Sequence, residues 1–207
     1  HYSWNQIAPS LQAFDSENER VEKIESAQRS AYERAVVKVH ARMELYAQLQ
    51  NTVQPQNSEN WKSELADYEN LIPSGVAAVR AQQSGQNYNT NVFNGFLGEL
   101  QRFDFMSQLQ PPLIVPPENS GTGVPPVQAG KMPAPLQSGD WQNVGTVLLE
   151  AAKGEKISPA VEDYVNMADA LKNQNVAGFN SALADLRSSL VPNFSHALAK
   201  SRAEVFF

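Results

Sequence analysis

The sequence predicts an all-α fold, with a long N-terminal helix followed by helical hairpins and an extended, Pro/Gly-rich connection in the middle. Apolar residues recur three or four positions apart through most of the chain, which is the spacing of one helix face. Polar capping residues precede these stretches, and breakers follow them. The 207 residues, 42% of them hydrophobic, can bury a substantial core. We therefore expect one compact domain composed of residues 1–110, a connection at 111–140 and residues 141–207.

The first predicted element is one unbroken helix over residues 16–50. A Ser-x-x-Glu capping box at Ser16 and Glu19 marks its start, and the breaker at 51–55 marks its end. Such a helix would be roughly 50 Å long at 1.5 Å per residue, which suggests a spine for the domain. Its apolar stripe consists of Val21, Ile24, Ala31, Ala35, Val39, Tyr46 and Leu49.

Shorter helices are expected next. One starts at the polar Ser58 and carries Trp61, Leu65 and Tyr68 on a single face, and Pro73 separates it from a further short helix. The strongest apolar stripe of the chain then precedes two consecutive prolines. We interpret this stripe as core rather than as the lining of a ligand pocket, because any buried helix shows the same spacing. It comprises Phe93, Phe96, Leu97, Leu100, Phe103 and Met106.

Residues 111–140 form the predicted connection. They hold eight of the thirteen prolines and four of the eleven glycines, so neither a long helix nor a central strand can run through them. A short extended piece at 113–115 could lie along the domain surface. Trp141, at the end of the connection, is interpreted as an anchor to the core rather than as a ring set against a ligand.

Residues 141–207 are predicted to form helical hairpins. Asp140 is the expected cap of a helix whose Val144 and Leu148 face one way, and Ser158 with Pro159 opens the next helix. Asn175 begins a third helix, and a final helix runs from residue 193 after the break at Val191 and Pro192.

Composition excludes several classes of function. With 22 acidic against 16 basic residues, the net charge of −6 offers no electrostatic footprint for nucleic acid. The absence of cysteine excludes disulfides, thiolate metal sites and thiol catalysis on this chain. The glycines of "SGTGVPP" are followed by prolines, where a phosphate-binding loop needs a helix N-terminus.

No catalytic or metal-binding residues can be assigned, and cofactor-binding residues stay unknown. The three histidines, His1, His40 and His196, occur outside any metal-ligand spacing. We interpret His40 and His196 as surface or structural residues, with haem or partner contact as the alternative. The adjacent Glu162 and Asp163 point in different directions on a helix, so we expect them on solvated faces. The four methionines are interpreted as core or loop residues.

The C-terminal run nevertheless resembles a known family. The pattern "W…GTVLLEAAKG…SPAVEDYVNMADALKNQNVAGFNSALADLRSSL…ALAKSRAEVFF" is similar to the extracytoplasmic domain of the fused system II cytochrome c biogenesis proteins, over residues 111–207. The first half, 1–109, matches much less well. The resemblance implies a parent membrane protein that exports or holds haem and joins it to CxxCH motifs of apocytochrome c. The family's haem-ligating histidines and tryptophan-rich motif have no equivalent here.

The resemblance implies a periplasmic accessory domain, with no cofactor of its own and with apocytochrome c or other biogenesis components as partners. It also implies that Phe206 and Phe207 precede a membrane-embedded part, where exposed phenylalanine is favourable. We expect little or no haem binding and a contact surface on the long first helix and the connection.

Two other readings stay open. The hairpin at residues 164–186 looks like one tetratricopeptide-type unit, which would make the chain a helical protein-interaction module unrelated to haem. A free-standing enzyme is the third reading, although no nucleophile–base pair or phosphate loop supports it.

Overall fold

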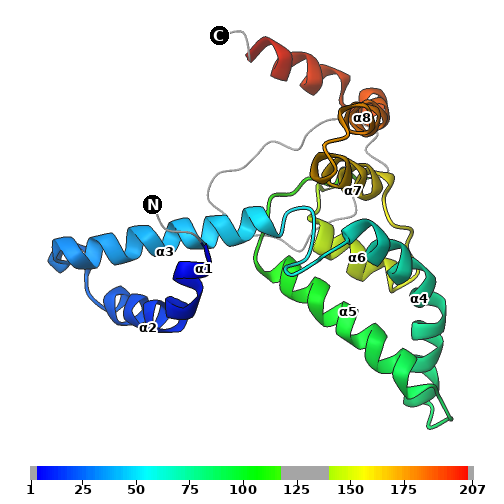
Figure 1. Cartoon of the computed structure of the whole chain (residues 1–207), viewed down its shortest axis with the longest axis horizontal. Helices are drawn as coiled ribbons and strands as arrows, with labels where there is room; N and C mark the ends of the chain where they lie inside the picture. The colour runs from blue at the N-terminus through cyan, green and yellow to red at the C-terminus, as the bar shows by residue number, and fades with distance from the viewer. Residues whose placement is uncertain (1–3, 118–139, 205–207) are drawn as a thin grey trace. The chain divides into compact units, whose positions relative to one another are not determined.

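The computed structural model describes residues 4–117 and 140–204 and is all-α, as predicted. Within these residues the only β-structure recorded is an isolated antiparallel bridge between Val115 and Gln142. The chain divides into two compact units, His1–Leu49 and Gln50–Phe207. The helices of each unit are labelled in Figure 1.

The first unit is a helical hairpin, not the single helix predicted over residues 16–50. It consists of α1 (Trp4–Ile7), a 3-10 turn (Ala8–Ser10), α2 (Leu11–Glu22), a second 3-10 turn (Ser26–Gln28) and α3 (Ala31–Gln50). The two longer helices pack antiparallel. Phe14 of α2 stacks on His40 of α3 with ring centroids 6.1 Å apart, and Arg20 pairs with Glu33 at 3.3 Å.

A second Ser-x-x-Glu sequence explains why the predicted helix was wrong. The Ser30 amide donates to the Glu33 carboxylate at 2.8 Å, and the Glu33 amide donates to the Ser30 hydroxyl at 3.3 Å. This reciprocal pair is a capping box at the start of α3. Ser16 instead lies inside α2, where its hydroxyl donates to the Gln12 carbonyl at 3.0 Å. The capping box predicted at Ser16 and Glu19 was therefore wrong, and the box in the structure is at Ser30 and Glu33.

Replacing Ser30 by alanine should destabilise the first unit by about 1 kcal/mol, because one of the free amides at the start of α3 loses its acceptor. Urea unfolding followed by far-UV circular dichroism measures this loss. Ser16→Ala is the matched control, since a hydroxyl bonded back to the preceding turn contributes little to a helix. An equal or larger loss for Ser16→Ala would contradict the assignment of the cap.

The described residues of the second unit form five helices. They are α4 (Trp61–Gln83), α5 (Thr90–Gln108), α6 (Val144–Ala151), α7 (Pro159–Lys172) and α8 (Val176–Glu204). Helix α5 packs against both α4 and α6, and α7 packs most extensively against α8 (Figure 1). The helix starts predicted at Ser158 with Pro159 and at Asn175 are confirmed.

Two predicted caps are displaced by two or three residues. Asn60, rather than Ser58, caps α4 by accepting from the Ser63 amide at 3.3 Å. Asn143, rather than Asp140, caps α6 by accepting from the Thr146 amide at 2.8 Å. In both places several polar residues precede the helix, so sequence alone does not decide which of them is the cap.

Prolines bend or interrupt these helices less than predicted. Helix α4 continues through Pro73, whose ring is exposed, so the predicted separation into two short helices was wrong. Apolar residues before and after Pro73 share the same core, and this burial offsets the lost backbone hydrogen bond. The break predicted at Val191 and Pro192 occurs as a kink at Phe194, with φ −126°, inside α8.

The core confirms the interpretation of the α5 stripe. Phe96, Phe103 and Met106 are fully buried, and the other three stripe residues pack more loosely at or near its edge. Phe103 lies at the centre, with its ring centroid 4.7 Å from Tyr68 and 6.1 Å from Trp61, both edge-on. The buried Tyr68 hydroxyl donates to the Leu148 carbonyl of α6 at 2.7 Å.

The boundary between the units follows Leu49, whereas the sequence-based division placed a connection at 111–140. Helices α5 and α6, on either side of that segment, pack together in one unit. The short extended piece at 113–115 is present: Val115 is buried in the bridge to Gln142, and the Ile114 carbonyl accepts from the Tyr164 hydroxyl at 3.1 Å. Trp141 contacts Phe194 with centroids 5.2 Å apart. Residues 118–139 lie outside the described residues.

Candidate functional site

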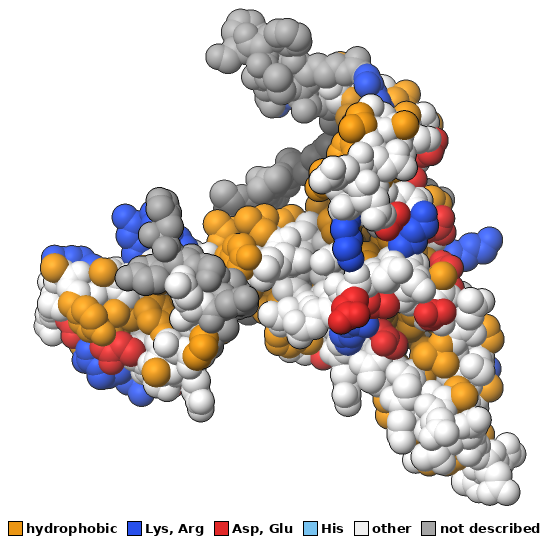
Figure 2. Space-filling view, viewed as in Figure 1, with side chains coloured by type: hydrophobic (Ala, Val, Ile, Leu, Met, Phe, Trp, Pro, Cys, Tyr) orange, Lys and Arg blue, Asp and Glu red, His pale blue; other side chains and the backbone are white. Residues whose placement is uncertain are grey.

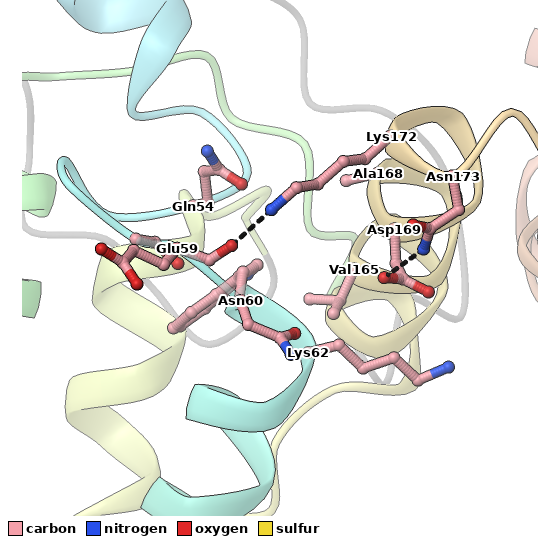
Figure 3. A pocket seen from close by; sticks show the side chains of 11 residues that line it. Gln54, Glu59, Asn60, Lys62, Val165, Ala168, Asp169, Lys172 and Asn173 are labelled. Carbon is pink, nitrogen blue, oxygen red and sulfur yellow. Dashed lines mark hydrogen bonds between the residues drawn. The ribbon is translucent and has the colours of Figure 1, made fainter.

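The second unit carries a pocket of about 480 Å³ between the start of α4 and the end of α7. Residues of the 54–62 segment form one wall, and Val165, Ala168, Asp169, Lys172 and Asn173 form the other (Figure 3). A pocket of this volume lies within the range of small-molecule and short-peptide sites. No motif in the sequence marks it, because it is assembled from a loop and a helix that lie a hundred residues apart in the chain.

Capping interactions hold the loop wall in place. The Glu64 carboxylate in the first turn of α4 accepts from the Glu59 amide at 3.0 Å, the Asn60 amide at 3.1 Å and the Ser58 hydroxyl at 2.9 Å. It also pairs with Arg102 of α5. Burial alone would raise the pKa of Glu64, but the hydrogen bonds from Arg102, Asn60 and Ser58 outweigh burial and lower it. The carboxylate therefore stays charged and keeps the loop fixed to α5.

One lysine connects the two walls. The Lys172 ammonium, near the end of α7, donates to the Glu59 carbonyl, and Figure 3 shows its side chain reaching across to that loop. On the same helix, Asn173 donates to the Asp169 carboxylate at 3.0 Å. Val165 points toward the opposite wall in Figure 3 and, with Ala168, gives the pocket an apolar surface.

Trp61 contributes a buried donor at this site. The residue is only 5% exposed, and its ring packs edge-on against Phe103. Within the part of the chain that the structure describes, its indole N–H has no hydrogen-bond acceptor. A buried donor without an acceptor costs about 1–3 kcal/mol, so such groups are uncommon and need an explanation.

The charges at the pocket are mixed. Lys62 and Lys172 line it together with Glu59 and Asp169, and amide side chains of Gln54, Asn60 and Asn173 lie between them. Figure 2 shows acidic and basic side chains interspersed on the visible face of this unit. Residues 4–117 and 140–204 contain no group of three His, Cys, Asp or Glu side chains that could hold a metal ion. The arrangement offers donors, acceptors and an apolar surface at once.

None of the candidate histidines from the sequence is among the residues that line this pocket. His40, in the first unit, has Nε2 3.6 Å from an Asp15 oxygen and Nδ1 3.7 Å from a Glu44 oxygen, with Phe14 stacked on its ring. These contacts tie α2 to α3. His1 and the side chain of His196 lie outside the described residues.

The adjacent acidic pair Glu162 and Asp163 has more acidic neighbours than the sequence indicated. Burial raises the pKa of Asp163, and the nearby charges of Asp185 and Glu162 raise it further. Burial also raises the pKa of Glu69 on α4, with Glu162 adding to the effect. Carboxylates of α7 therefore repel Glu69 of α4 on one side and Asp185 of α8 on the other.

Asp163→Asn should raise the melting temperature at neutral pH. A carboxyl whose pKa is higher in the folded than in the unfolded chain destabilises the fold at high pH, and this cost disappears as the pH falls through the folded-state pKa. The stability difference between variant and parent should therefore be largest near pH 7 and shrink toward pH 4. Asp67→Asn, at an exposed position of α4, is the control. A lower melting temperature for Asp163→Asn at pH 7 would refute the repulsion.

No family model, curated protein or solved structure matches this chain. No helix in the described ranges is long and apolar enough to cross a membrane.

Proposed function

We propose that this chain is an extracytoplasmic accessory domain of a membrane-bound cytochrome c biogenesis protein, and that it contacts the apocytochrome polypeptide while other parts of that protein handle haem. The observation that carries the proposal is the run from Trp141 to Phe207, which resembles that family in three successive helices and in its ending. The proposed location is the periplasmic face of a bacterial membrane.

The position of the run within the fold supports the proposal. The helices α6, α7 and α8 belong to one compact unit, and α6 is joined to α4 through the hydrogen bond between the Tyr68 hydroxyl and the Leu148 carbonyl. The resemblance therefore falls on a coherent packed structure rather than on scattered segments.

The surroundings of His40 favour polypeptide contact over haem ligation. Iron ligation needs a free imidazole nitrogen in an apolar pocket. Each ring nitrogen of His40 lies within 3.7 Å of a carboxylate oxygen, and one ring face is stacked on Phe14. Ligation of haem by His40 would break contacts that join α2 to α3.

A haem titration tests whether the chain contacts polypeptide rather than ligating haem. When haem is added to the purified chain, we expect no saturable shift of its Soret band. A one-to-one shift with a micromolar or lower dissociation constant, lost in His40→Ala or His196→Ala, would overturn the assignment of haem handling to other parts of the protein. His196→Ala is included because its side chain lies outside the described residues.

A helical protein-interaction module unrelated to haem is the second candidate. The α7–α8 hairpin favours it, because two antiparallel helices joined by a short turn are the unit of such modules. Binding assays with a synthetic peptide spanning a CxxCH motif of apocytochrome c separate the candidates. The cytochrome c biogenesis domain requires binding that depends on the CxxCH sequence, whereas an unrelated interaction module does not.

A further inference from the structure

We propose that the pocket between the start of α4 and the end of α7 binds an extended polypeptide segment. This inference rests on the proposed function, which is contact with a polypeptide. It places that contact in the pocket. The sequence-based expectation placed the contact on the first helix and the connection, whereas this pocket lies on neither.

The polar groups of the pocket match those of a peptide backbone. An extended backbone presents N–H donors and carbonyl acceptors alternately, and the pocket offers both kinds of partner along its walls. The side-chain amides of Gln54, Asn60 and Asn173 line the pocket. Asn60 already accepts from Ser63 and Asn173 already donates to Asp169, so Asn60 has its NH2 group and Asn173 its carbonyl oxygen to offer a backbone. A site for a phosphate or another compact anion would instead gather cations, whereas Glu59 and Asp169 line this pocket beside its two lysines.

The apolar surface gives a place for one side chain of the peptide. Val165 and Ala168 lie one helical turn apart on α7 and face the loop wall across the pocket (Figure 3). A volume of about 480 Å³ accommodates a short segment rather than a folded element. Val165 is only 3% exposed, so we expect the segment to place a small or medium aliphatic side chain against Ala168.

Trp61 also lines the pocket, and its buried indole N–H has no acceptor among the residues described. Buried donors of this kind are uncommon, and an acceptor that reached this one would remove the cost of the unpaired group. The Lys172 contact to the Glu59 carbonyl joins the two walls of the pocket.

Nuclear magnetic resonance on the full chain maps the site. The probes are a peptide spanning one CxxCH motif of apocytochrome c, its scrambled version and an unrelated aliphatic-rich peptide. We expect at least one of them to shift the backbone amide signals of Lys62, Ala168 and Asn173. Ala168→Trp, which fills the pocket from a partly exposed position, should weaken binding by at least about tenfold. Ala184→Trp, at an exposed site on α8 outside the pocket, should leave it unchanged.

The outcomes separate this inference from the proposed function. If the CxxCH peptide binds but shifts other amides and tolerates Ala168→Trp, the pocket is the wrong site and the proposed function stands. If all three peptides bind equally well in the pocket, the site is right and the cytochrome-specific partner is wrong. Failure of every peptide to perturb the pocket, in the unaltered chain at millimolar concentration, would overturn the inference.

Discussion

Replacing Phe103 by alanine should lower the free energy of unfolding of the second unit by about 3–5 kcal/mol. The ring is fully buried and contacts Trp61 and Tyr68, so its removal leaves a cavity lined by two large aromatic side chains. Tyr68 is itself fixed by its hydrogen bond to Leu148, so this side of the cavity cannot collapse easily. Urea unfolding monitored by near-UV circular dichroism measures the loss.

Phe105→Ala is the matched control, because Phe105 lies on the same helix and is 51% exposed. It should cost less than about 1 kcal/mol, as expected for a surface position. Equal losses for the two variants would mean that the α5 stripe is not the core of the unit.

Gly145→Ala should destabilise the same unit by about 3 kcal/mol, because it adds an atom where two helix backbones nearly touch. A Cβ at this position would lie 2.8 Å from both the Phe103 carbonyl oxygen and the Ser107 amide nitrogen. Backbone atoms cannot rotate aside as a side chain can, so α6 would have to move away from α5. Amide hydrogen exchange in α5 and α6, together with urea unfolding, would report this separation.

The control for Gly145→Ala is Gly98→Ala on α5. A Cβ at Gly98 meets nothing within 4 Å, so alanine should stabilise the helix by about 0.5–1 kcal/mol through its higher helix propensity. The two substitutions are chemically identical and should have opposite signs. A neutral or stabilising Gly145→Ala would show that α6 packs less closely than the structure indicates.

The sequence predicted helix content and the central stripe well, because periodicity reports burial directly. Phe96, Phe103 and Met106 are buried together, as their spacing requires. The prediction of helix starts was wrong where two equally good local signals were present. Ser16 and Ser30 both begin a Ser-x-x-Glu pattern, but only Ser30 caps a helix, whereas Ser16 lies inside α2.

Pro73 is a second place where a local signal gave the wrong prediction. Local chemistry makes Pro73 a helix breaker, yet α4 continues through it because residues on both sides are buried against a shared core. The pocket could not be predicted from the sequence. Glu59 and Lys172 are far apart in the chain, and no spacing rule relates a loop before one helix to the end of another.

The bridge between Val115 and Gln142 has a consequence for how this fold can change over evolutionary time. Two hydrogen bonds of 2.9 Å join these residues, so the chain leaves the core at one point and returns to it at the adjacent one. Val115 and Gln142 are therefore held side by side. Doubling the number of residues between two joined points of a chain costs only about 0.6 kcal/mol of closure entropy. Insertions, deletions or a grafted recognition sequence can therefore accumulate between these two residues while α5 and α6 keep their packing.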